Sequence, residues 1–401
     1  MKLVSAGHCL RAILFAVLAA CCGLWVDAQS DPRQAAVLLE QQGRVADAET
    51  AWHAVLETHP ADPEAFAHLG LLEARQEHYK EAIIFYRKAV ARNPHMPGLR
   101  LNLGLAEFKG GDLKGAIQSF EELLKAAPKN SSEALRYTTL LGLAHYGLGE
   151  YSAAIPYLKQ ATAADQQNLP FRLALAHSCL SARQFTCVLD VYHEILSLNA
   201  ESAEADMLAG EALDEMRDHS GAIEQFRAAV KADPKFPDVH FGLGYLLWTQ
   251  NQFDEAAKEF QAELDNVPEH PQALAFLADA DMQIGKSDQA LALIEKSIRI
   301  DPRLERAHLD LGILYSDGGR RDEALKEFEI AERLAPEDPN VHWRLARLYQ
   351  SMGRRQEAKA EFDKTNNLHK AENATIFSKL KSAQEKGKPA DDAASLPAAQ
   401  R

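Results

Sequence analysis

The chain contains 401 residues, with 44 lysines and arginines against 58 aspartates and glutamates, so its formal net charge is −14 at pH 7. This acidic surplus argues against nucleic-acid binding, because nucleic-acid-binding proteins present a basic face. Apolar residues make up 46% of the chain and charged residues 25%, which is ordinary for a soluble protein.

Residues 1–28 are predicted to form a secretory signal peptide. The stretch Met1–Arg11 carries positive charge, the apolar run Ala12–Val26 follows it, and Val26-Asp27-Ala28 resembles a small-x-small cleavage site. An apolar run of about 15 residues is short for a helix that spans a membrane. We therefore expect a secreted or periplasmic mature chain without a transmembrane domain.

A lipoprotein signal that ends at Ala20 is the alternative interpretation. The segment Leu18-Ala19-Ala20-Cys21 resembles the lipobox of bacterial lipoproteins, in which the cysteine is lipidated after cleavage. Against this interpretation, the sequence stays apolar through Val26, where lipoproteins usually become polar. A lipid anchor on Cys21 would make the product an outer-membrane lipoprotein.

From residue 29 onward the chain repeats itself with a step of 34 residues, apart from one step of 38. A fixed period of this length is typical of a solenoid built from stacked repeats. The period is marked by one small residue, at Ala48, Ala82, Ala116, Ala154, Val188, Ala222, Ala256, Ala290, Ala324 and Ala358.

Three further positions recur at fixed distances from this small residue. Glycine or alanine stands before it in the repeat, a large apolar residue follows it, and a proline closes most repeats, as in Gly70, Ala82, Tyr86 and Pro94. Apolar residues within each repeat recur at helical spacing, and glycine-rich turns separate two such stretches. Each repeat is therefore predicted to form two helices, the second of which cannot continue through the closing proline.

The pattern divides the chain into ten repeats and one insertion. Four extra residues, Ser131–Ala134, precede the fourth repeat, and Ser132 is expected to cap a first helix that begins early there. The repeats cover residues 29–62, 63–96, 97–130, 135–168, 169–202, 203–236, 237–270, 271–304, 305–338 and 339–372.

These features resemble the tetratricopeptide repeat (TPR) family, which shares the 34-residue period, the Leu-Gly pair, the alanine, the aromatic residue and the closing proline. Residues 63–96 carry all of them, with Leu69-Gly70, Ala82, Tyr86 and Pro94. The resemblance covers residues 29–372 and implies an all-α fold, a right-handed superhelical solenoid of antiparallel helix pairs. It also implies a non-catalytic scaffold that binds a protein or peptide segment in a concave groove.

The recurring small residues are expected to let the paired helix backbones approach closely, while the large residue fills the remaining gap. The positions assigned to this packing are Gly70, Ala82, Gly104, Ala116, Gly142, Ala154, Gly210, Ala222, Gly244, Ala256, Gly312 and Ala324.

Two cysteines, Cys179 and Cys187, lie on the two predicted helices of the fifth repeat. They flank the turn between these helices, so a disulfide is geometrically feasible in an oxidising compartment. The alternative is a buried thiol at Cys179 and an unrelated Cys187.

In the TPR family the first helices line the groove, so apolar residues exposed on them are candidate partner-binding residues. Phe241, Tyr245 and Trp248 follow one another at i, i+4 and i+7, which places them on one helix face. They form either an aromatic anchor for a peptide or, for Phe241 and Trp248, packing against neighbouring repeats. The further apolar candidates are Leu105, Phe108, Tyr146, Met207 and Phe276.

Charge along the predicted groove is uneven. The sixth repeat is acidic and the last two are more basic, through Glu204, Glu211, Asp214 and Glu215 on one side and Arg306, Arg344 and Arg347 on the other. Such polarity either fixes the direction of a bound segment or forms a solvated face.

We find no residue set that indicates catalysis, a cofactor or a metal, because the sequence lacks a glycine-rich phosphate loop, HExxH and GxSxG. His240, His308 and His342 share one repeat position and are expected to pack. Two alternative functions stay open. One is an outer-membrane lipoprotein accessory to envelope assembly, secretion, pilus or polysaccharide export, and the other is a glycan-binding or glycosyltransferase-accessory module.

The segment after the last repeat is predicted in two parts. Residues 373–385 are expected to form a polar capping helix, because the last repeat of a solenoid has no neighbour to cover it. Residues 386–401 are rich in Lys, Ala, Asp and Pro and are predicted to be disordered.

Overall fold

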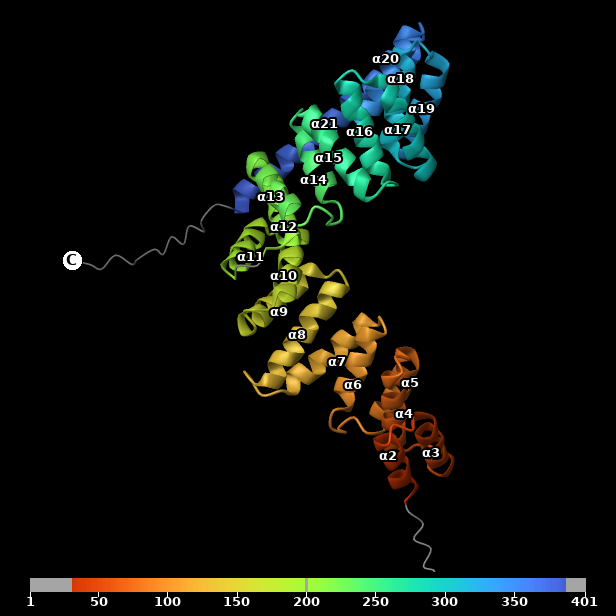
Figure 1. Ribbon diagram of the computed structural model, residues 1–401, viewed down its shortest axis with the longest axis vertical. Helices are drawn as coiled ribbons and strands as arrows, with labels where there is room; N and C mark the ends of the chain where they lie inside the picture. The colour runs from red at the N-terminus through yellow and green to blue at the C-terminus, as the bar shows by residue number, and fades with distance from the viewer. Residues whose placement is uncertain (1–30, 199–200, 387–401) are drawn as a thin grey trace, which may run out of the picture. The chain divides into compact units, whose positions relative to one another are not determined.

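The computed structural model describes residues 31–198 and 201–386 of the chain. In these residues it contains twenty helices, α2 to α21, and no strand (Figure 1). The predicted all-α solenoid is thereby confirmed. The predicted signal peptide with Cys21, and residues 387–401 of the predicted tail, lie outside the described residues.

The helices alternate between the first and the second helix of each repeat. The first helices are α2 (Pro32–Gln41), α4 (Pro63–Arg75), α6 (Leu99–Lys109), α8 (Ser132–Gly147), α10 (Leu169–Ser181), α12 (Ala203–Glu215), α14 (Val239–Thr249), α16 (Pro271–Gln283), α18 (Glu305–Asp317) and α20 (Pro339–Ser351). The second helices are α3 (Val45–Thr58), α5 (Tyr79–Arg92), α7 (Leu113–Ala126), α9 (Tyr151–Ala164), α11 (Phe185–Ser197), α13 (His219–Ala232), α15 (Phe253–Asn266), α17 (Ser287–Ile300), α19 (Arg321–Leu334) and α21 (Arg355–Lys386).

The chain divides into two compact halves, Met1–Val191 and Tyr192–Arg401, which we call the N-terminal and the C-terminal half. Within each half, helices adjacent in sequence pack on one another, as α4 does on α5 and α12 on α13. First helices of successive repeats also touch, for example α14 with α16 and α16 with α18. Contacts of this short range are the mark of a repeat array, in which each repeat is stabilised by its neighbours.

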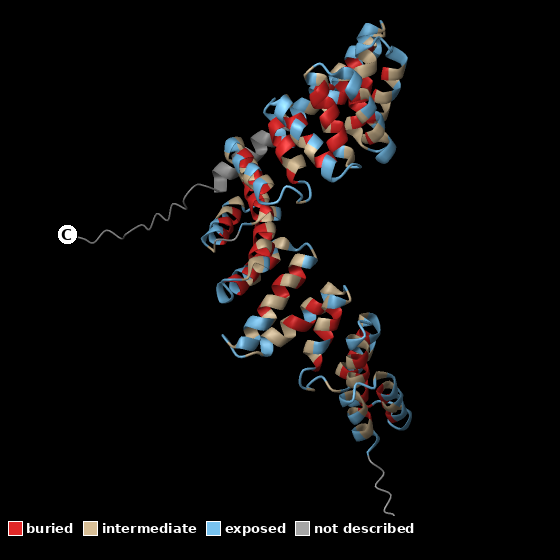
Figure 2. Ribbon diagram, in the orientation of Figure 1, coloured by how far each residue is buried: buried red, intermediate tan, exposed pale blue. Residues whose placement is uncertain are grey.

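The small residues that mark the period are buried in all ten repeats, with none more than 4% exposed. Figure 2 shows buried stretches alternating with exposed ones along the helices. The glycine of the first helix lies against the large residue sixteen positions later in the same repeat. A Cβ atom on Gly244 would lie 2.8 Å from the ring of Phe260, and one on Gly70 would lie 2.8 Å from the ring of Tyr86. The glycine is therefore required because the aromatic ring occupies the space of its missing side chain.

The turn between the two helices uses the same backbone conformation in every repeat. The fifteenth residue of each repeat lies in this turn, and it has a positive φ, between 57° and 83°, in all ten repeats. Six of these residues are glycine, which adopts this left-handed conformation without steric cost. The other four are Glu77, Arg183, Arg217 and Asn251.

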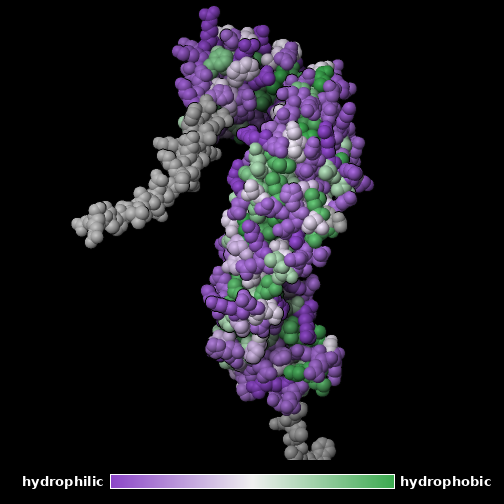
Figure 3. Space-filling view, turned by 90° about the vertical axis from the view of Figure 1, so that its left-hand side faces the viewer, coloured by the Kyte–Doolittle hydropathy of each residue, from purple (hydrophilic) through white to green (hydrophobic). Residues whose placement is uncertain are grey.

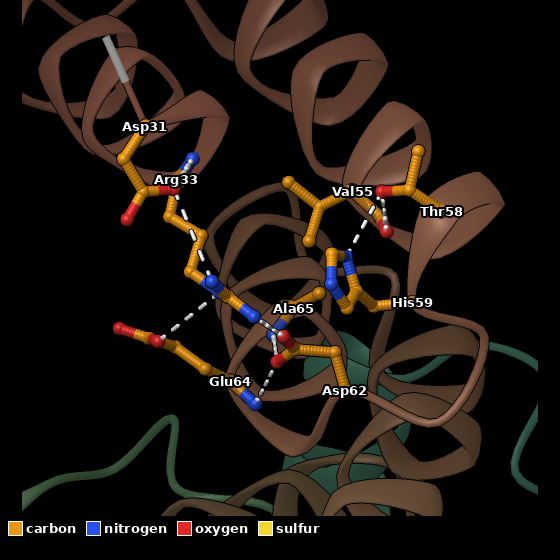
Figure 4. A network of polar contacts seen from close by, with 8 residues as sticks. All are labelled: Asp31, Arg33, Val55, Thr58, His59, Asp62, Glu64 and Ala65. Carbon is orange, nitrogen blue, oxygen red and sulfur yellow. Dashed lines mark hydrogen bonds and ion pairs between the residues drawn. The ribbon is translucent and has the colours of Figure 1, made fainter. Parts of the chain in front are cut away.

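Side-chain caps define several first-helix starts, and Asp62 is the most connected of them (Figure 4). Its carboxylate accepts hydrogen bonds from the backbone N–H groups of Glu64 and Ala65 and from the Arg33 side chain of α2. Burial alone raises the pKa of the Asp62 carboxyl, but Arg33 and these N–H groups outweigh it and lower the pKa. In the fourth repeat the cap is Ser131, so the predicted cap at Ser132 is wrong by one residue.

Two of the three histidines at the shared repeat position join one repeat to the next. His308 contacts Glu327 of its own repeat through Nδ1, at 2.7 Å, and the carbonyl of Pro302 in the preceding repeat through Nε2, at 3.1 Å. His342 makes the corresponding contacts with Glu361 and Pro336. Each ring thus contacts a glutamate of its own repeat and a proline carbonyl of the preceding one, which places both histidines in the packing between repeats.

At the fifth repeat, the structure joins Cys179 of α10 to Cys187 of α11 by a disulfide, with the two Cα atoms 5.9 Å apart. Both cysteines are buried, and the link closes the turn between the two helices.

The last helix differs from the separate capping helix expected at residues 373–385. These residues continue the second helix of the tenth repeat without a break, so α21 has 32 residues where the other second helices have 13 or 14. The sequence around residue 372 contains neither glycine nor proline, and nothing there stops the helix.

Replacing Gly244 by alanine should destabilise the C-terminal half by about 1–3 kcal/mol, because the added methyl group overlaps the Phe260 ring. The melting temperature, followed by circular dichroism, measures the effect. Adding Phe260→Leu should recover part of the loss, since the next repeat pairs Ala278 with the smaller Ile294. A Gly244→Ala variant that melts like the wild type would contradict this packing.

Candidate partner-binding site

Four aromatic rings gather on the first helices of the seventh and eighth repeats, within the C-terminal half. Phe276 of α16 lies between three rings of α14, with centroids 5.9 Å from Phe241, 5.5 Å from Tyr245 and 5.2 Å from Trp248. The contacts with Tyr245 and Trp248 are edge-to-face, an arrangement that aromatic pairs favour. We call these four residues the aromatic cluster.

The polar edge of this cluster is fixed by a chain of charged side chains. The indole nitrogen of Trp248 donates to Asp279 Oδ2 at 2.6 Å, and Arg306 contacts the same oxygen at 2.6 Å. Arg306 Nε donates to Asp310 Oδ2 at 2.9 Å. The Arg306 guanidinium also lies over the Trp248 ring, 5.0 Å from its centroid, and over Phe276 at 5.5 Å. Three successive first helices, α14, α16 and α18, are linked in this way.

Asp310 is the most perturbed carboxyl of the site. Its residue is 1% exposed, and its Oδ1 atom has no hydrogen-bond partner among the described residues. Burial raises the pKa of Asp310 to about 7, with Asp279 and Glu305 adding to the increase and Arg306 opposing it. The network therefore carries less negative charge near neutral pH than its carboxyl groups suggest.

Exposure differs across the aromatic cluster. Tyr245 is 40% exposed, whereas the other three rings are half-buried against the core around Phe260. The tyrosine ring is thus exposed on a surface where the Trp248 indole N–H and the Arg306 guanidinium already have protein partners. Such a surface offers ring faces and edges to a ligand, which suits apolar and aromatic side chains. Apolar residues form small separate patches on the mostly hydrophilic face in Figure 3.

The other predicted candidates lie elsewhere. In the N-terminal half, Leu105 and Phe108 of α6 pack against the core around Phe120, and Tyr146 of α8 lies 5.6 Å from the ring of His177. In the C-terminal half, Met207 of α12 packs against two core clusters, around Phe226 and around Val239. The structure therefore brings four of the predicted apolar residues into ring contact and places Leu105, Phe108 and Tyr146 in the other half, while Met207 shares the core beneath the aromatic cluster.

Arg344 and Arg347 lie on α20 around a residue that the sequence did not single out, Trp343. This tryptophan is 40% exposed, and the two guanidinium groups lie 5.1 and 5.5 Å from its ring centroid. The sequence could have identified Trp343 as a candidate, because it stands at the same repeat position as Phe241.

Two carboxylate–histidine groups have a spacing that a metal ion could accept, Asp238 with Glu263 and His270, and Glu332 with His342 and Glu361. In the first, His270 Nδ1 accepts the Ala273 N–H, so Nε2 carries the hydrogen that points to Asp238. In the second, Lys364 lies 2.9 Å from both glutamates. Both groups have protein partners, and neither indicates a metal site.

Replacing Asp310 by asparagine should change how the stability of the C-terminal half depends on pH. Because the pKa of Asp310 is higher in the folded chain than in the unfolded chain, its contribution to stability falls as pH rises from about 4 to about 7. Asparagine cannot ionise, so the variant should gain stability relative to the wild type over that range. Melting temperatures at several pH values test this. A constant difference between the two proteins would contradict it.

Comparison with known proteins gives one family and several distant relatives. The tetratricopeptide repeat model matches residues 33–97, 86–131, 101–169, 139–186, 173–237, 207–271, 241–305 and 309–365. Protein CTR9 homolog of Arabidopsis thaliana is 25% identical over 293 residues, which cover 70% of this chain and 27% of that protein. Human protein O-mannosyl-transferase TMTC1 is 25% identical over 206 residues, which cover 50% of this chain and 23% of that protein.

The chain thus spans about a quarter of the length of these two relatives. Among solved structures, a tetratricopeptide repeat protein from Parabacteroides merdae is similar with a TM-score of 0.48 and 19% identity, over 63% of this chain and 97% of that one. None of the described helices is both long enough and apolar enough to cross a membrane. With family matches from residue 33 to residue 365, the chain belongs to the tetratricopeptide repeat family.

Proposed function

We propose that this protein is a non-catalytic scaffold that binds a segment of a partner protein on the first helices of its C-terminal half, with the aromatic cluster as the anchor. TPR proteins act as protein-interaction scaffolds, which gives the general class. The observation that carries the specific proposal is the exposure of Tyr245 beside rings whose neighbouring Trp248 indole N–H and Arg306 guanidinium already have protein partners.

The chemistry of the cluster favours an apolar or aromatic side chain as ligand. Aromatic residues in well-packed pockets contribute most of the binding energy in many interfaces. Here the rings are held by the Trp248–Asp279 hydrogen bond and by Arg306, so little side-chain entropy is lost when a ligand docks.

Glycan binding is the weaker candidate for the same surface. Sugar hydroxyls need polar groups placed to receive them. Asp279 and Asp310, the carboxylates of the charged chain beside the rings, are 3% and 1% exposed and are engaged by Trp248 and Arg306. The transferase name of the human relative belongs to a protein of which this chain spans 23%.

Replacing Tyr245 and Trp248 together by alanine should weaken binding to apolar and aromatic peptides roughly 30-fold, since hot-spot truncations cost about 2 kcal/mol or more. Paired peptide and glycan arrays, probed with the full-length chain, measure the effect. The control is Val267→Ala with Ile300→Ala, which removes two exposed apolar residues of the same half. Unchanged peptide binding, or binding confined to glycans, would overturn the proposal.

We further propose that the protein works in the bacterial cell envelope, secreted or periplasmic after cleavage behind Ala28. The disulfide between Cys179 and Cys187 supports an oxidising compartment, because such bonds are rare in the reducing cytosol. The alternative is an outer-membrane lipoprotein anchored through Cys21, accessory to assembly or export.

Mass spectrometry of the mature chain from its native host separates these locations. A free N-terminus at Gln29 is expected for secretion, and an acylated Cys21 for the lipoprotein. A full-length chain that begins at Met1 would contradict both.

A further inference from the structure

We propose that Trp343, Arg344 and Arg347 form a carboxylate-binding subsite, which takes the acidic residues of the same peptide segment whose apolar residue docks on the aromatic cluster. This inference rests on the proposed function and names the chemistry of a second part of the ligand. We call the three residues the arginine subsite.

One exposed indole ring organises the subsite. The Arg344 guanidinium carbon lies 5.1 Å from the Trp343 ring centroid, and that of Arg347 lies 5.5 Å away. Both distances are within the range of cation–π attraction. The ring therefore restrains two flexible side chains and holds both guanidinium groups around itself on α20. A planar guanidinium presents paired N–H donors that match the two oxygens of a carboxylate.

Neither arginine forms an ion pair or a side-chain hydrogen bond with any residue that the structure describes. Arg306 shows the contrast, because it contacts Asp279 at 2.6 Å and Asp310 at 2.9 Å. Arg354, which follows α20, also pairs with Glu357 at 3.0 Å. In a chain with a net charge of −14, two guanidinium groups around one ring and without an ion-pair partner among the described residues are a local positive site. A carboxylate of a ligand would supply the ion-pair partner that these two guanidinium groups lack.

The subsite lies on the same helix face as the aromatic cluster. Counting from the start of each repeat, Trp343 stands at the position of Phe241, Arg344 at that of Phe276, and Arg347 at that of Tyr245. First helices of successive repeats touch from α14 through α16 and α18 to α20. An extended segment that runs along these helices therefore meets the aromatic cluster and the arginine subsite in turn.

The spacing sets the length of that segment. Packed helices lie about 9 Å apart, so three steps from α14 to α20 span about 27 Å. An extended chain advances about 3.4 Å per residue, and about eight residues bridge this distance. The ligand is accordingly a peptide with an apolar or aromatic residue about eight positions from an acidic one.

The opposite end of the same face argues against a uniformly negative ligand. Glu204 and Glu211 on α12 stand at the repeat positions of Arg306 and Tyr245, and no described residue forms an ion pair with either glutamate. A nucleic acid or a polyanionic glycan that followed the first helices would meet these carboxylates as well as the arginines. Like charges repel, so a peptide with acidic residues at only one end fits this charge pattern best.

The test uses the full-length chain and synthetic peptides that carry a tryptophan and, about eight residues away on either side, a Glu-Glu or a Gln-Gln pair. Fluorescence anisotropy should show roughly five- to tenfold tighter binding of the glutamate peptide in one of the two orientations, with the preference lost at high salt. Replacing Arg344 and Arg347 by glutamine should abolish the preference and leave the binding of the glutamine peptide unchanged.

The matched control is Arg321→Gln with Arg333→Gln, which removes the same charge from exposed positions on the second helix α19. This control should keep the preference for glutamate. Equal binding of the two peptides by the wild type, or an equal loss in both double variants, would overturn the arginine subsite. The Tyr245→Ala, Trp248→Ala variant separates the two proposals. If the Tyr245→Ala, Trp248→Ala variant loses all peptide binding while the Arg344→Gln, Arg347→Gln variant keeps the preference for glutamate, the aromatic anchor is supported and the arginine subsite is refuted.

Discussion

The close approach of two helices within each repeat is the contact on which the rest of the structure depends. An alanine or valine on the second helix is fully buried in nine repeats and 4% exposed in the tenth, and a small residue stands on the first helix of every repeat. Where that small residue is glycine, its missing side chain leaves room for the large residue of the same repeat, as at Gly244 and Phe260. Because the contact is local, it recurs in every repeat, and the first helices are left to carry different side chains on their outer face.

That freedom explains why the candidate site is built across repeats. The aromatic rings come from α14 and α16, and the arginine that covers them comes from α18. No single repeat holds enough of these groups to make an anchor. Only stacking brings Trp248, Asp279 and Arg306 within contact distance, so folding of the array and formation of the site are the same event.

The sequence predicted the fold closely because the same pattern of small and large residues recurs in ten repeats. The helix pairs, the buried alanines and the role of the closing prolines follow from spacing alone. The cap at Ser131 was missed by one residue, since two serines stand side by side and only the backbone geometry chooses between them. The continuous α21 was missed because the repeat pattern predicts a boundary at residue 372 that the helix itself does not need.

For the candidate site, the spacing along one helix correctly grouped Phe241, Tyr245 and Trp248. It could not predict which side chains of different helices contact one another. The contact of Arg306 with Asp279 joins residues 27 positions apart in the chain, and its place over Trp248 spans a still longer separation. Trp343 was overlooked because a lone tryptophan at a position where the family often has bulky residues is ordinary. Its exposure, and the two guanidinium groups around it, are properties of the folded chain.

The histidines at the start of α18 and α20 have a consequence for how the array comes apart. Each ties the proline carbonyl that ends one repeat to a glutamate of the next, so the eighth, ninth and tenth repeats share polar bonds in addition to apolar contact. In a one-dimensional array, nearest-neighbour coupling sets where the first break occurs. Opening either of these two junctions must therefore break polar bonds as well as the apolar contact between the repeats.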